Sequence, residues 1–168
     1  RQYHASEEVS DGLEVYFIDV GQGDSTLIVD DDEAMLIDGG LSNQSKKIYT
    51  ILKEKGIDSL SYVVATHPHA DHVGGLSAAL EAAYCKQILV PYTESENTTY
   101  NKFLKKAEEK NVPVNAASDG DTFSLGEATI QVLGPTDILP IRFLFVSKIC
   151  NTAPERGFPV SASTFTAL

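Results

Sequence analysis

The order of the apolar patterns along the chain constrains its fold more than any other feature. Apolar residues that alternate or run together predict strands at residues 13–18, 25–29, 34–37, 62–66, 87–90, 113–115, 122–124 and 128–133. Helical spacing predicts helices at about residues 43–55, after Gly74-Gly75, and at about 98–110, where Asn97 is the expected cap. A hairpin comes first and strand–helix alternation follows it. This order predicts an α/β fold with a mixed sheet and helices on its outer face.

The character of the chain changes near Gly134-Pro135. Up to residue 136 it has 10 basic and 22 acidic residues, whereas from Asp137 onward it has 3 basic and 2 acidic residues. Residues 138–149 are apolar without a clear period, and residues 151–168 show no helix or strand pattern. We therefore expect a polar tail or linker at residues 1–12, a folded domain at residues 13–135, and an atypical tail at residues 136–168 that is irregular or poorly ordered.

The overall charge excludes some classes of partner. Thirteen Lys and Arg against 24 Asp and Glu give the 168-residue chain a net charge of −11, which argues against a strong nucleic-acid-binding surface or an anionic-membrane surface. No apolar run approaches the roughly 20 residues of a membrane helix. The chain begins at Arg1 without a signal peptide. Removal of an upstream signal would indicate secretion or the cell surface; otherwise we expect the cytoplasm, and the localisation stays open.

The two cysteines give little information about the compartment of the protein. Cys85 and Cys150 are far apart, and no C-x-x-C motif is present. Buried or free thiols are the favoured interpretation, with a disulfide between the two cysteines as the alternative. The redox compartment therefore stays open.

Three of the four histidines and an aspartate lie within six residues, directly after the apolar run 62–65. The segment reads Thr66-His67-Pro68-His69-Ala70-Asp71-His72. Histidine is the commonest metal ligand, and a neighbouring carboxylate can hold a second metal or take a proton from metal-bound water. A purely structural hydrogen-bonded cluster is the weaker alternative. The pattern predicts a strand that delivers metal ligands on the loop at its end.

The spacing suggests how these ligands divide. In an extended segment His67 and His69 point the same way, so both can reach one metal. Asp71 and His72 can serve a second metal close by, or Asp71 can orient a metal-bound water. Zinc with an open coordination position lowers the pKa of bound water to about 7 and supplies hydroxide at neutral pH. Gly74-Gly75 are expected to let the backbone turn sharply beside the site.

The motif His67-x-His69-x-Asp71-His72 resembles the signature of the metallo-β-lactamase fold, a four-layer αββα hydrolase superfamily. Two further segments, residues 17–25 with the sequence FIDVGQGDS and residues 35–40 with MLIDGG, resemble its competence-protein branch, the hydrolase domain of ComEC/Rec2-type proteins. The resemblance implies that His67 and His69 ligate a first metal and that Asp71 and His72 ligate a second. It also implies that Asp38 lies under the site and supports it through hydrogen bonds, although an ordinary turn after a strand is the alternative for Asp38. For Asp24 and Ser25 a structural loop role is favoured over substrate contact.

The family pattern also contains ligands that this chain lacks. A further His, a bridging Asp after a later strand and a last His are expected downstream of His72, but no His follows His72. We therefore expect only the N-terminal part of the sandwich, in a truncated chain or one whose residues 136–168 derive from a shifted reading frame. A homodimer could supply the missing ligands or cover a bare sheet face.

The resemblance implies a metal-dependent hydrolase with one or two zinc ions, with manganese or iron as alternatives. Metal-bound hydroxide would attack a phosphodiester or related phosphoester, with Asp71 holding the water or acting as the base. A small-molecule lactam or lactone is the alternative substrate. Because the ligand set is incomplete, a non-catalytic metal-binding domain is the hypothesis from another class.

Overall fold

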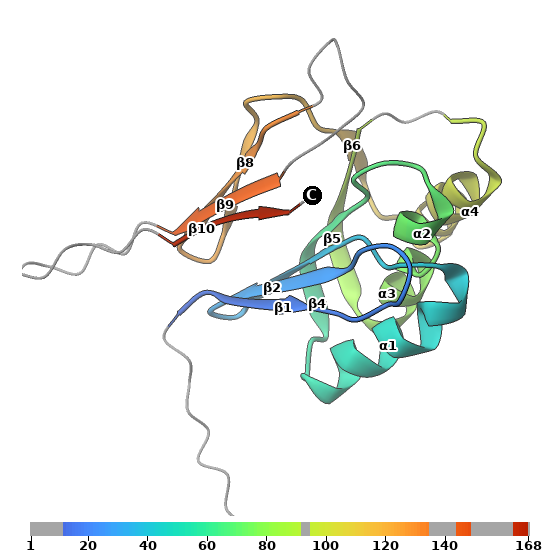
Figure 1. The fold of residues 1–168 in the computed structure, drawn as a ribbon, viewed down its shortest axis with the longest axis horizontal. Coiled ribbons are helices and arrows are strands. Elements are labelled where there is room, and N and C mark those ends of the chain that lie inside the picture. Colours follow the sequence, from blue (N-terminus) through green and yellow to red (C-terminus); the bar gives the residue numbers. More distant parts are fainter. Residues whose placement is uncertain (1–11, 92–94, 135–143, 149–162, 168) are drawn as a thin grey trace, which may run out of the picture.

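The computed structural model describes residues 12–91 and 95–134, together with the backbone of two strands at residues 144–148 and 163–167 (Figure 1). Its larger sheet has six strands in the order β1-β2-β3-β4-β5-β6. They are β1 (Glu14–Phe17), β2 (Thr26–Asp30), β3 (Glu33–Ile37), β4 (Ser59–Val64), β5 (Tyr84–Val90) and β6 (Val114–Ala116). The first three strands pair antiparallel, and β3 to β6 pair parallel. The predicted α/β class with a mixed sheet is confirmed.

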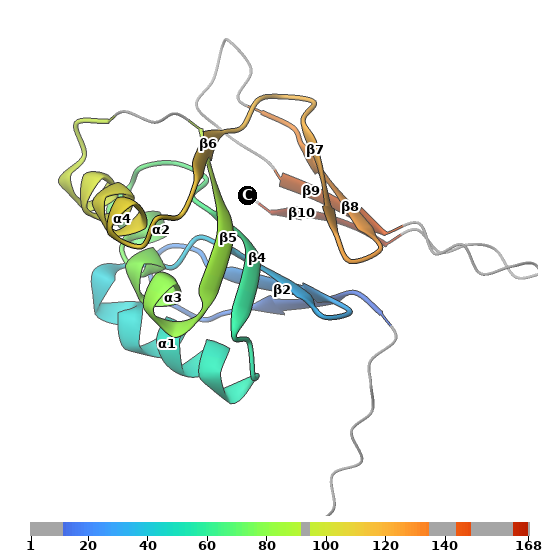
Figure 2. The same cartoon turned by 180° about the vertical axis from the view of Figure 1, so that it is seen from behind.

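The helices α1, α3 and α4 cover one face of this sheet (Figures 1 and 2). The helical elements are η1 (Ser42–Gln44), α1 (Ser45–Glu54), α2 (Ala70–Val73), α3 (Leu76–Ala82) and α4 (Thr98–Glu109). Asn97 caps α4 as predicted, because its side-chain oxygen accepts hydrogen bonds from the backbone N–H groups of Thr99 and Tyr100 at 2.9 and 3.1 Å. No helix within the described ranges is long and apolar enough to cross a membrane.

A second sheet lies on the opposite side of the first, with the strand order β10-β9-β8-β7 (Figure 2). It contains β7 (Thr122–Leu125), β8 (Ala128–Val132), β9 (Leu144–Lys148) and β10 (Ser163–Ala167), and every pair is antiparallel. The prediction that the region after Asp137 lacks strands is therefore wrong for β9 and β10. Backbone pairing with β8 organises β9 where the side-chain pattern alone carries no period. Residues 1–11 and the rest of the predicted tail lie outside the described residues.

The described residues thus form three layers, helices on a six-stranded sheet on a four-stranded sheet. Among them no helix covers the outer side of the second sheet. This arrangement matches the N-terminal part of the expected αββα sandwich.

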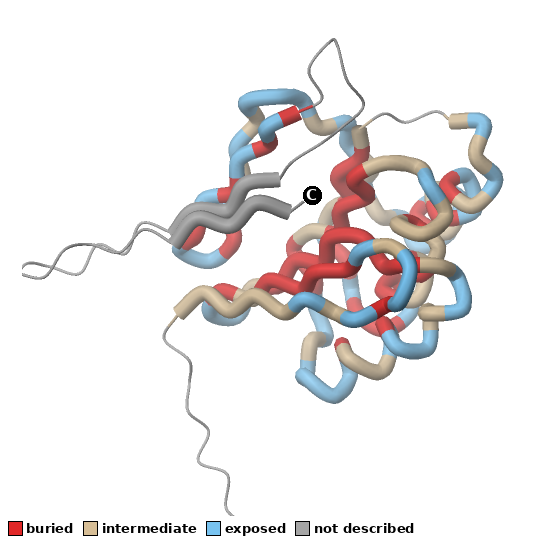
Figure 3. The backbone as a smooth tube through the Cα atoms, in the orientation of Figure 1, coloured by how far each residue is buried: buried red, intermediate tan, exposed pale blue. Residues whose placement is uncertain are grey.

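Alternating side chains of the larger sheet supply two separate cores. In β3, Leu36 packs with the helices, whereas Met35 and Ile37 face the second sheet, as the two-residue period of a strand requires. Buried residues accordingly follow the central strands (Figure 3). Fully burying each such side chain stabilises the fold by about 1.5–3 kcal/mol. The sheet is therefore held from both faces, which gives its strand ends fixed positions.

Asp30 joins the two sheets. It ends β2, directly before the acidic residues Asp31 and Asp32, with none of its surface exposed. Its Oδ2 accepts hydrogen bonds from the backbone N–H groups of Glu127 and Ala128 at 2.9 and 2.8 Å. A buried carboxylate is tolerated because such donors replace its hydration. The acceptor role of Asp30 therefore depends on residues almost one hundred positions away in the sequence.

Cys85 is a buried free thiol on β5. Burial raises its pKa to about 11, so it stays protonated at neutral pH. Cys150 lies outside the described residues, and the alternative of a disulfide stays untested.

Candidate metal centre

The histidine segment leaves the larger sheet at the carboxyl end of β4, beside the end of β3. Ile37 pairs with Val64 in the parallel register of these strands, and the backbone N–H of Asp38 donates to the carbonyl of Val64 at 2.9 Å. Because neighbouring parallel strands end at the same edge, Asp38 lies beside Thr66 although 28 positions separate them. The loop then runs through His67 to α2, which carries the rest of the motif.

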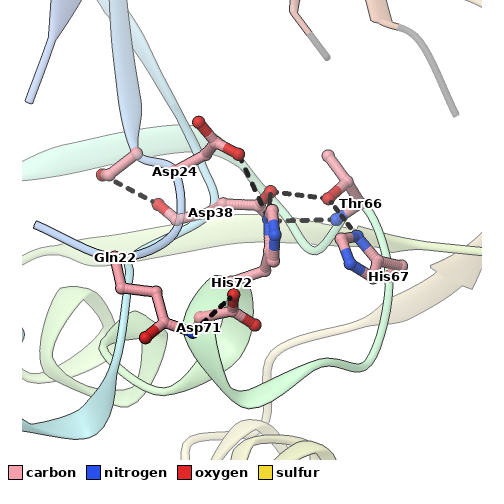
Figure 4. Close-up of polar contacts among 8 residues, drawn as sticks. Gln22, Asp24, Asp38, Thr66, His67, Asp71 and His72 are labelled. Atoms are coloured by element: carbon pink, nitrogen blue, oxygen red, sulfur yellow. Dashed lines mark hydrogen bonds and ion pairs between the residues drawn. The ribbon is translucent and has the colours of Figure 1, made fainter. Parts of the chain in front are cut away.

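Asp38 is the buried centre of the site, with only 1% of its surface exposed. Its Oδ1 accepts from the backbone N–H of Thr66 at 2.9 Å, and its Oδ2 accepts from the Thr66 hydroxyl at 2.5 Å. The same Oδ2 lies 2.8 Å from His72 Nδ1 (Figure 4). The Ser25 hydroxyl donates to the Asp38 carbonyl at 3.0 Å. Asp38 has a positive φ of 57°, a conformation that Asp adopts more readily than most residues.

These contacts determine which nitrogen of each ring is free. An ionised carboxylate only accepts, so the single proton of the Thr66 hydroxyl goes to Asp38. The Thr66 oxygen, 3.0 Å from His67 Nδ1, must therefore accept from that nitrogen. His72 Nδ1 likewise donates to Asp38. In the neutral rings both Nε2 atoms keep their lone pairs, which is the state that a metal ion requires.

Of the four predicted ligands, His67 and His72 lie close together beside Asp38, the predicted supporting residue, whereas His69 and Asp71 lie outside this group. Asp38, His67 and His72 each offer one ligand atom, and these atoms lie within 4.8 Å of one another. The His67 ring centroid is 3.9 Å from that of His72 and 4.7 Å from that of His69. His69 is exposed at the start of α2. Asp71 is half-buried, and its Oδ2 is 3.5 Å from the side-chain amide of Gln22.

Glycines bring the Asp38 turn against the segment that follows His72. The Gly39 N–H donates to the His72 carbonyl at 2.7 Å, and the Gly75 N–H donates to the Gly40 carbonyl at 3.1 Å. A Cβ at Gly75 would lie 2.1 Å from the Gly39 oxygen. Gly74 and Gly75 form the turn between α2 and α3, with backbone angles in the right-handed helical region. A side chain is excluded at Gly75 because its backbone touches that of Gly39.

The pKa values of His67 and His72 are shifted in opposite directions. Burial, followed by the neighbouring His72, lowers the pKa of His67. Burial also acts to lower the pKa of His72, but the hydrogen bond and charge of Asp38, with the charges of Asp71 and Asp24, outweigh it and raise that pKa. Asp24 Oδ2 lies 3.8 Å from His72 Nδ1 and is 61% exposed. The site therefore carries a concentration of negative charge that suits a cation.

The histidine motif assigns no role to Thr66 or Gln22, and the sequence favours a structural loop role for Asp24. Thr66 directly precedes His67, and a hydroxyl beside a ligand is a recognisable signal for a hydrogen-bond partner. Gln22 and Asp24 lie in the 19–24 loop, 49 and 48 positions before the residues they approach. Such contacts depend on the packing of the loop against α2, which spacing in the sequence does not indicate.

Comparison with known proteins identifies the family. Residues 18–143 match the model of the metallo-beta-lactamase superfamily. The chain therefore belongs to the metallo-beta-lactamase superfamily, a family of hydrolases. The predicted resemblance is confirmed, and the match includes Asp38 and the whole histidine motif.

Individual relatives agree with this assignment. The chain is 29% identical over 140 residues to ComE operon protein 3 of Bacillus subtilis strain 168, which covers 73% of this chain and 18% of that protein. It is 29% identical over 130 residues to a hydroxyacylglutathione hydrolase of Idiomarina loihiensis, covering 77% and 40% of the two chains. A metallo-beta-lactamase variant of Cronobacter sakazakii shares the fold with a TM-score of 0.58 at 19% identity, over 80% of this chain and 56% of that one. The chain thus spans less than two thirds of each of these proteins.

Proposed function

We propose that the chain carries part of the active site of a metal-dependent hydrolase whose substrates are phosphodiesters or related phosphoesters. The observation that carries the metal site is the hydrogen-bond relay from Asp38 through Thr66 to His67, and from Asp38 directly to His72. It orients two imidazoles with Nε2 free, in the manner of hydrogen-bonded metal-binding histidines. The similarity to ComE operon protein 3 agrees with the competence-protein branch, for which the sequence resemblance implies a phosphoester substrate.

In this proposal His67, His69, Asp71 and His72 hold one or two divalent cations, with zinc as the favoured metal and manganese or iron as alternatives. Asp38 supports the site and does not ligate. Both of its oxygens already accept hydrogen bonds from Thr66, and one of them also accepts from His72. A metal at those oxygens would have to displace these donors from a buried carboxylate.

A bound divalent cation lowers the pKa of coordinated water to about 7 and polarises the substrate oxygen. The residues of the chain supply orientation and proton transfer. Asp71, half-buried beside the histidines, orients the attacking water and accepts its proton. Burial acts to raise the pKa of Asp71, but the hydrogen bond from its own backbone N–H, followed by that from Gln22 and by the charge interactions with His72 and His69, outweighs burial and lowers that pKa. Asp38 keeps the rings from rotating during the reaction.

One observation favours a second function. No histidine follows His72 in the sequence, and the group of mutually close ligand atoms in the described part of the chain is the trio of Asp38, His67 and His72. With Asp38 as support, the two imidazoles of this trio and the neighbouring His69 and Asp71 suffice to bind one cation. A metal-binding domain without catalysis is therefore the second candidate, and a lactam or lactone hydrolase remains the alternative enzyme.

Hydrolysis of bis(p-nitrophenyl) phosphate and of nitrocefin by the zinc-loaded chain distinguishes these functions. The proposal predicts turnover of the phosphodiester alone, lost in His69→Ala. Turnover of nitrocefin alone would replace the phosphoesterase with a lactamase. Metal binding that His69→Ala abolishes, with neither substrate hydrolysed, would favour the non-catalytic domain.

A further inference from the structure

The 19–24 loop, which joins β1 to β2, has a fixed form although most of its residues are exposed. At its base the Ile18 N–H donates to the Ser25 carbonyl at 2.9 Å. Within it the Gly21 N–H donates to Asp19 Oδ1 at 3.0 Å, and the Lys47 ammonium group of α1 donates to the Asp19 carbonyl. These contacts define the direction in which the loop leaves the sheet.

The tip of this loop rests on α2 at Asp71. Gly21 and Gly23 have φ angles of 71° and 95°, in the region that favours glycine. A Cβ at Gly23 would lie 1.7 Å from the Asp71 carbonyl oxygen and 2.6 Å from its carbonyl carbon. The Asp24 carbonyl accepts from the Gly40 N–H at 3.0 Å, which ties the far side of the loop to the Asp38 turn. The backbones of Gly23 and Asp71 therefore touch directly, and glycine is the residue that permits this contact.

This contact places the Gln22 amide over the Asp71 carboxylate. Gln22 Nε2 donates to Asp71 Oδ2 at 3.5 Å (Figure 4). Among the described residues, Gln22 is the side chain that hydrogen-bonds this carboxylate. The chemistry of the amide suits a ligand: it restrains one oxygen and adds no charge. A Lys at this position would compete with a cation, and a Glu would repel the carboxylate.

We propose that Gln22 is a positioning residue that holds the Asp71 carboxylate for the metal ion. This inference rests on the proposed function, in which Asp71 is a ligand. Asp71 is on a four-residue helix and only half-buried, so few contacts besides its own backbone N–H and Gln22 restrict its carboxylate. Restricting the carboxylate in advance reduces the entropy that metal binding must remove. The Gly21-Gln22-Gly23 sequence thus acquires a role in the site.

Cobalt(II) titration of the metal-free chain, followed by the visible absorption of the bound ion, tests the proposal. Gln22→Met keeps the length of the side chain and removes its donor. Loss of a partner that orients a ligand typically weakens metal binding 10- to 100-fold, and for this exposed amide we expect roughly tenfold with a changed absorption spectrum. Gln131→Met, at an exposed position of β8, is the matched control and should titrate as the original chain does.

A double-mutant cycle separates positioning from a general effect on the fold. In the Asp71→Ala background, which removes the acceptor of this hydrogen bond, Gln22→Met should have no further effect on cobalt affinity. An unchanged affinity in the single variant, or an equal loss in both backgrounds, would overturn the proposal. Cobalt binding without phosphodiester hydrolysis would refute the proposed catalysis while this cycle still decides the role of Gln22. A chain that binds no cobalt refutes both.

Discussion

Asp38→Asn should impair metal binding while leaving the fold nearly intact. Asn has the shape of Asp and also tolerates a positive φ. Its oxygen can still accept from the Thr66 N–H, but its amide nitrogen takes the place of Oδ2. That nitrogen donates to the Thr66 hydroxyl and to His72 Nδ1, the two groups that now donate to Asp38. The Thr66 proton then points to His67 Nδ1.

The substitution therefore reverses the tautomer of both rings, because each Nδ1 becomes an acceptor and each proton moves to Nε2. Metal binding through Nε2 must restore the original tautomers. Each ring then loses one hydrogen bond, at about 1–1.5 kcal/mol. For the two rings together the cost is about 2–3 kcal/mol, or roughly 30- to 150-fold in affinity.

Two measurements check this reasoning. Zinc affinity by competition with a chromophoric chelator should fall by that factor, whereas the free energy of unfolding of the metal-free protein should change by less than about 1.5 kcal/mol. Nitrogen chemical shifts of the rings should show Nδ1–H in the original chain and Nε2–H in Asp38→Asn. Unchanged affinity, or lost affinity with unchanged tautomers, would refute the role assigned to Asp38.

Three further predictions concern the protonation of the site and the packing around it. In the metal-free protein the pKa of His72 should lie above its ordinary 6.5, as an NMR titration can show. The free energy of unfolding should therefore exceed that of His72→Gln by the full contribution of protonated His72 below pH 6.5, and this excess should vanish as the pH rises through the raised pKa. An excess that grows with pH would contradict this. Gly23→Ala should destabilise the protein by at least about 1–2 kcal/mol, since it combines a positive φ with a clash at the Asp71 backbone; an unchanged urea midpoint would show that the loop is not docked there. Asp30→Ala should destabilise by about 2–4 kcal/mol because two backbone N–H groups lose their acceptor, whereas the exposed Asp32→Ala should change the urea midpoint little, and equal effects would contradict the inter-sheet contact.

The fold follows from the sequence where the local pattern and the tertiary contacts agree. The hairpin of β2 and β3, the parallel strands β4 and β5, and the cap at Asn97 all have such local signals. The signals are weaker at the strand starts: β4 begins at Ser59 and β5 at Tyr84, three residues before each prediction. Polar residues there pair with neighbouring strands instead of forming an apolar run. Long-range pairing likewise creates β9 and buries Asp30.

The candidate site likewise combines a local motif, which the sequence shows, with long-range contacts, which it does not. The histidine motif is contiguous, so its spacing indicates His67 and His72 as neighbours but does not indicate Asp38, which completes the close trio. The hydrogen bonds of Asp38 cross 28 positions to Thr66 and 34 to His72, and only a family resemblance suggests them. The contact of Gln22 with Asp71 crosses 49 positions and depends on two backbones that touch at Gly23. Local spacing cannot report such contacts because they arise from packing.

Zinc bound per chain at equilibrium, measured by elemental analysis after dialysis, tests the central claim most directly. The account predicts at least one zinc ion per chain in the original protein and in His4→Ala, which removes the histidine outside the motif. It predicts a loss of bound zinc in the double variant His67→Ala/His72→Ala, whose rings Asp38 orients. Equal zinc in all three proteins, or none in the original chain, would contradict a metal centre at this site.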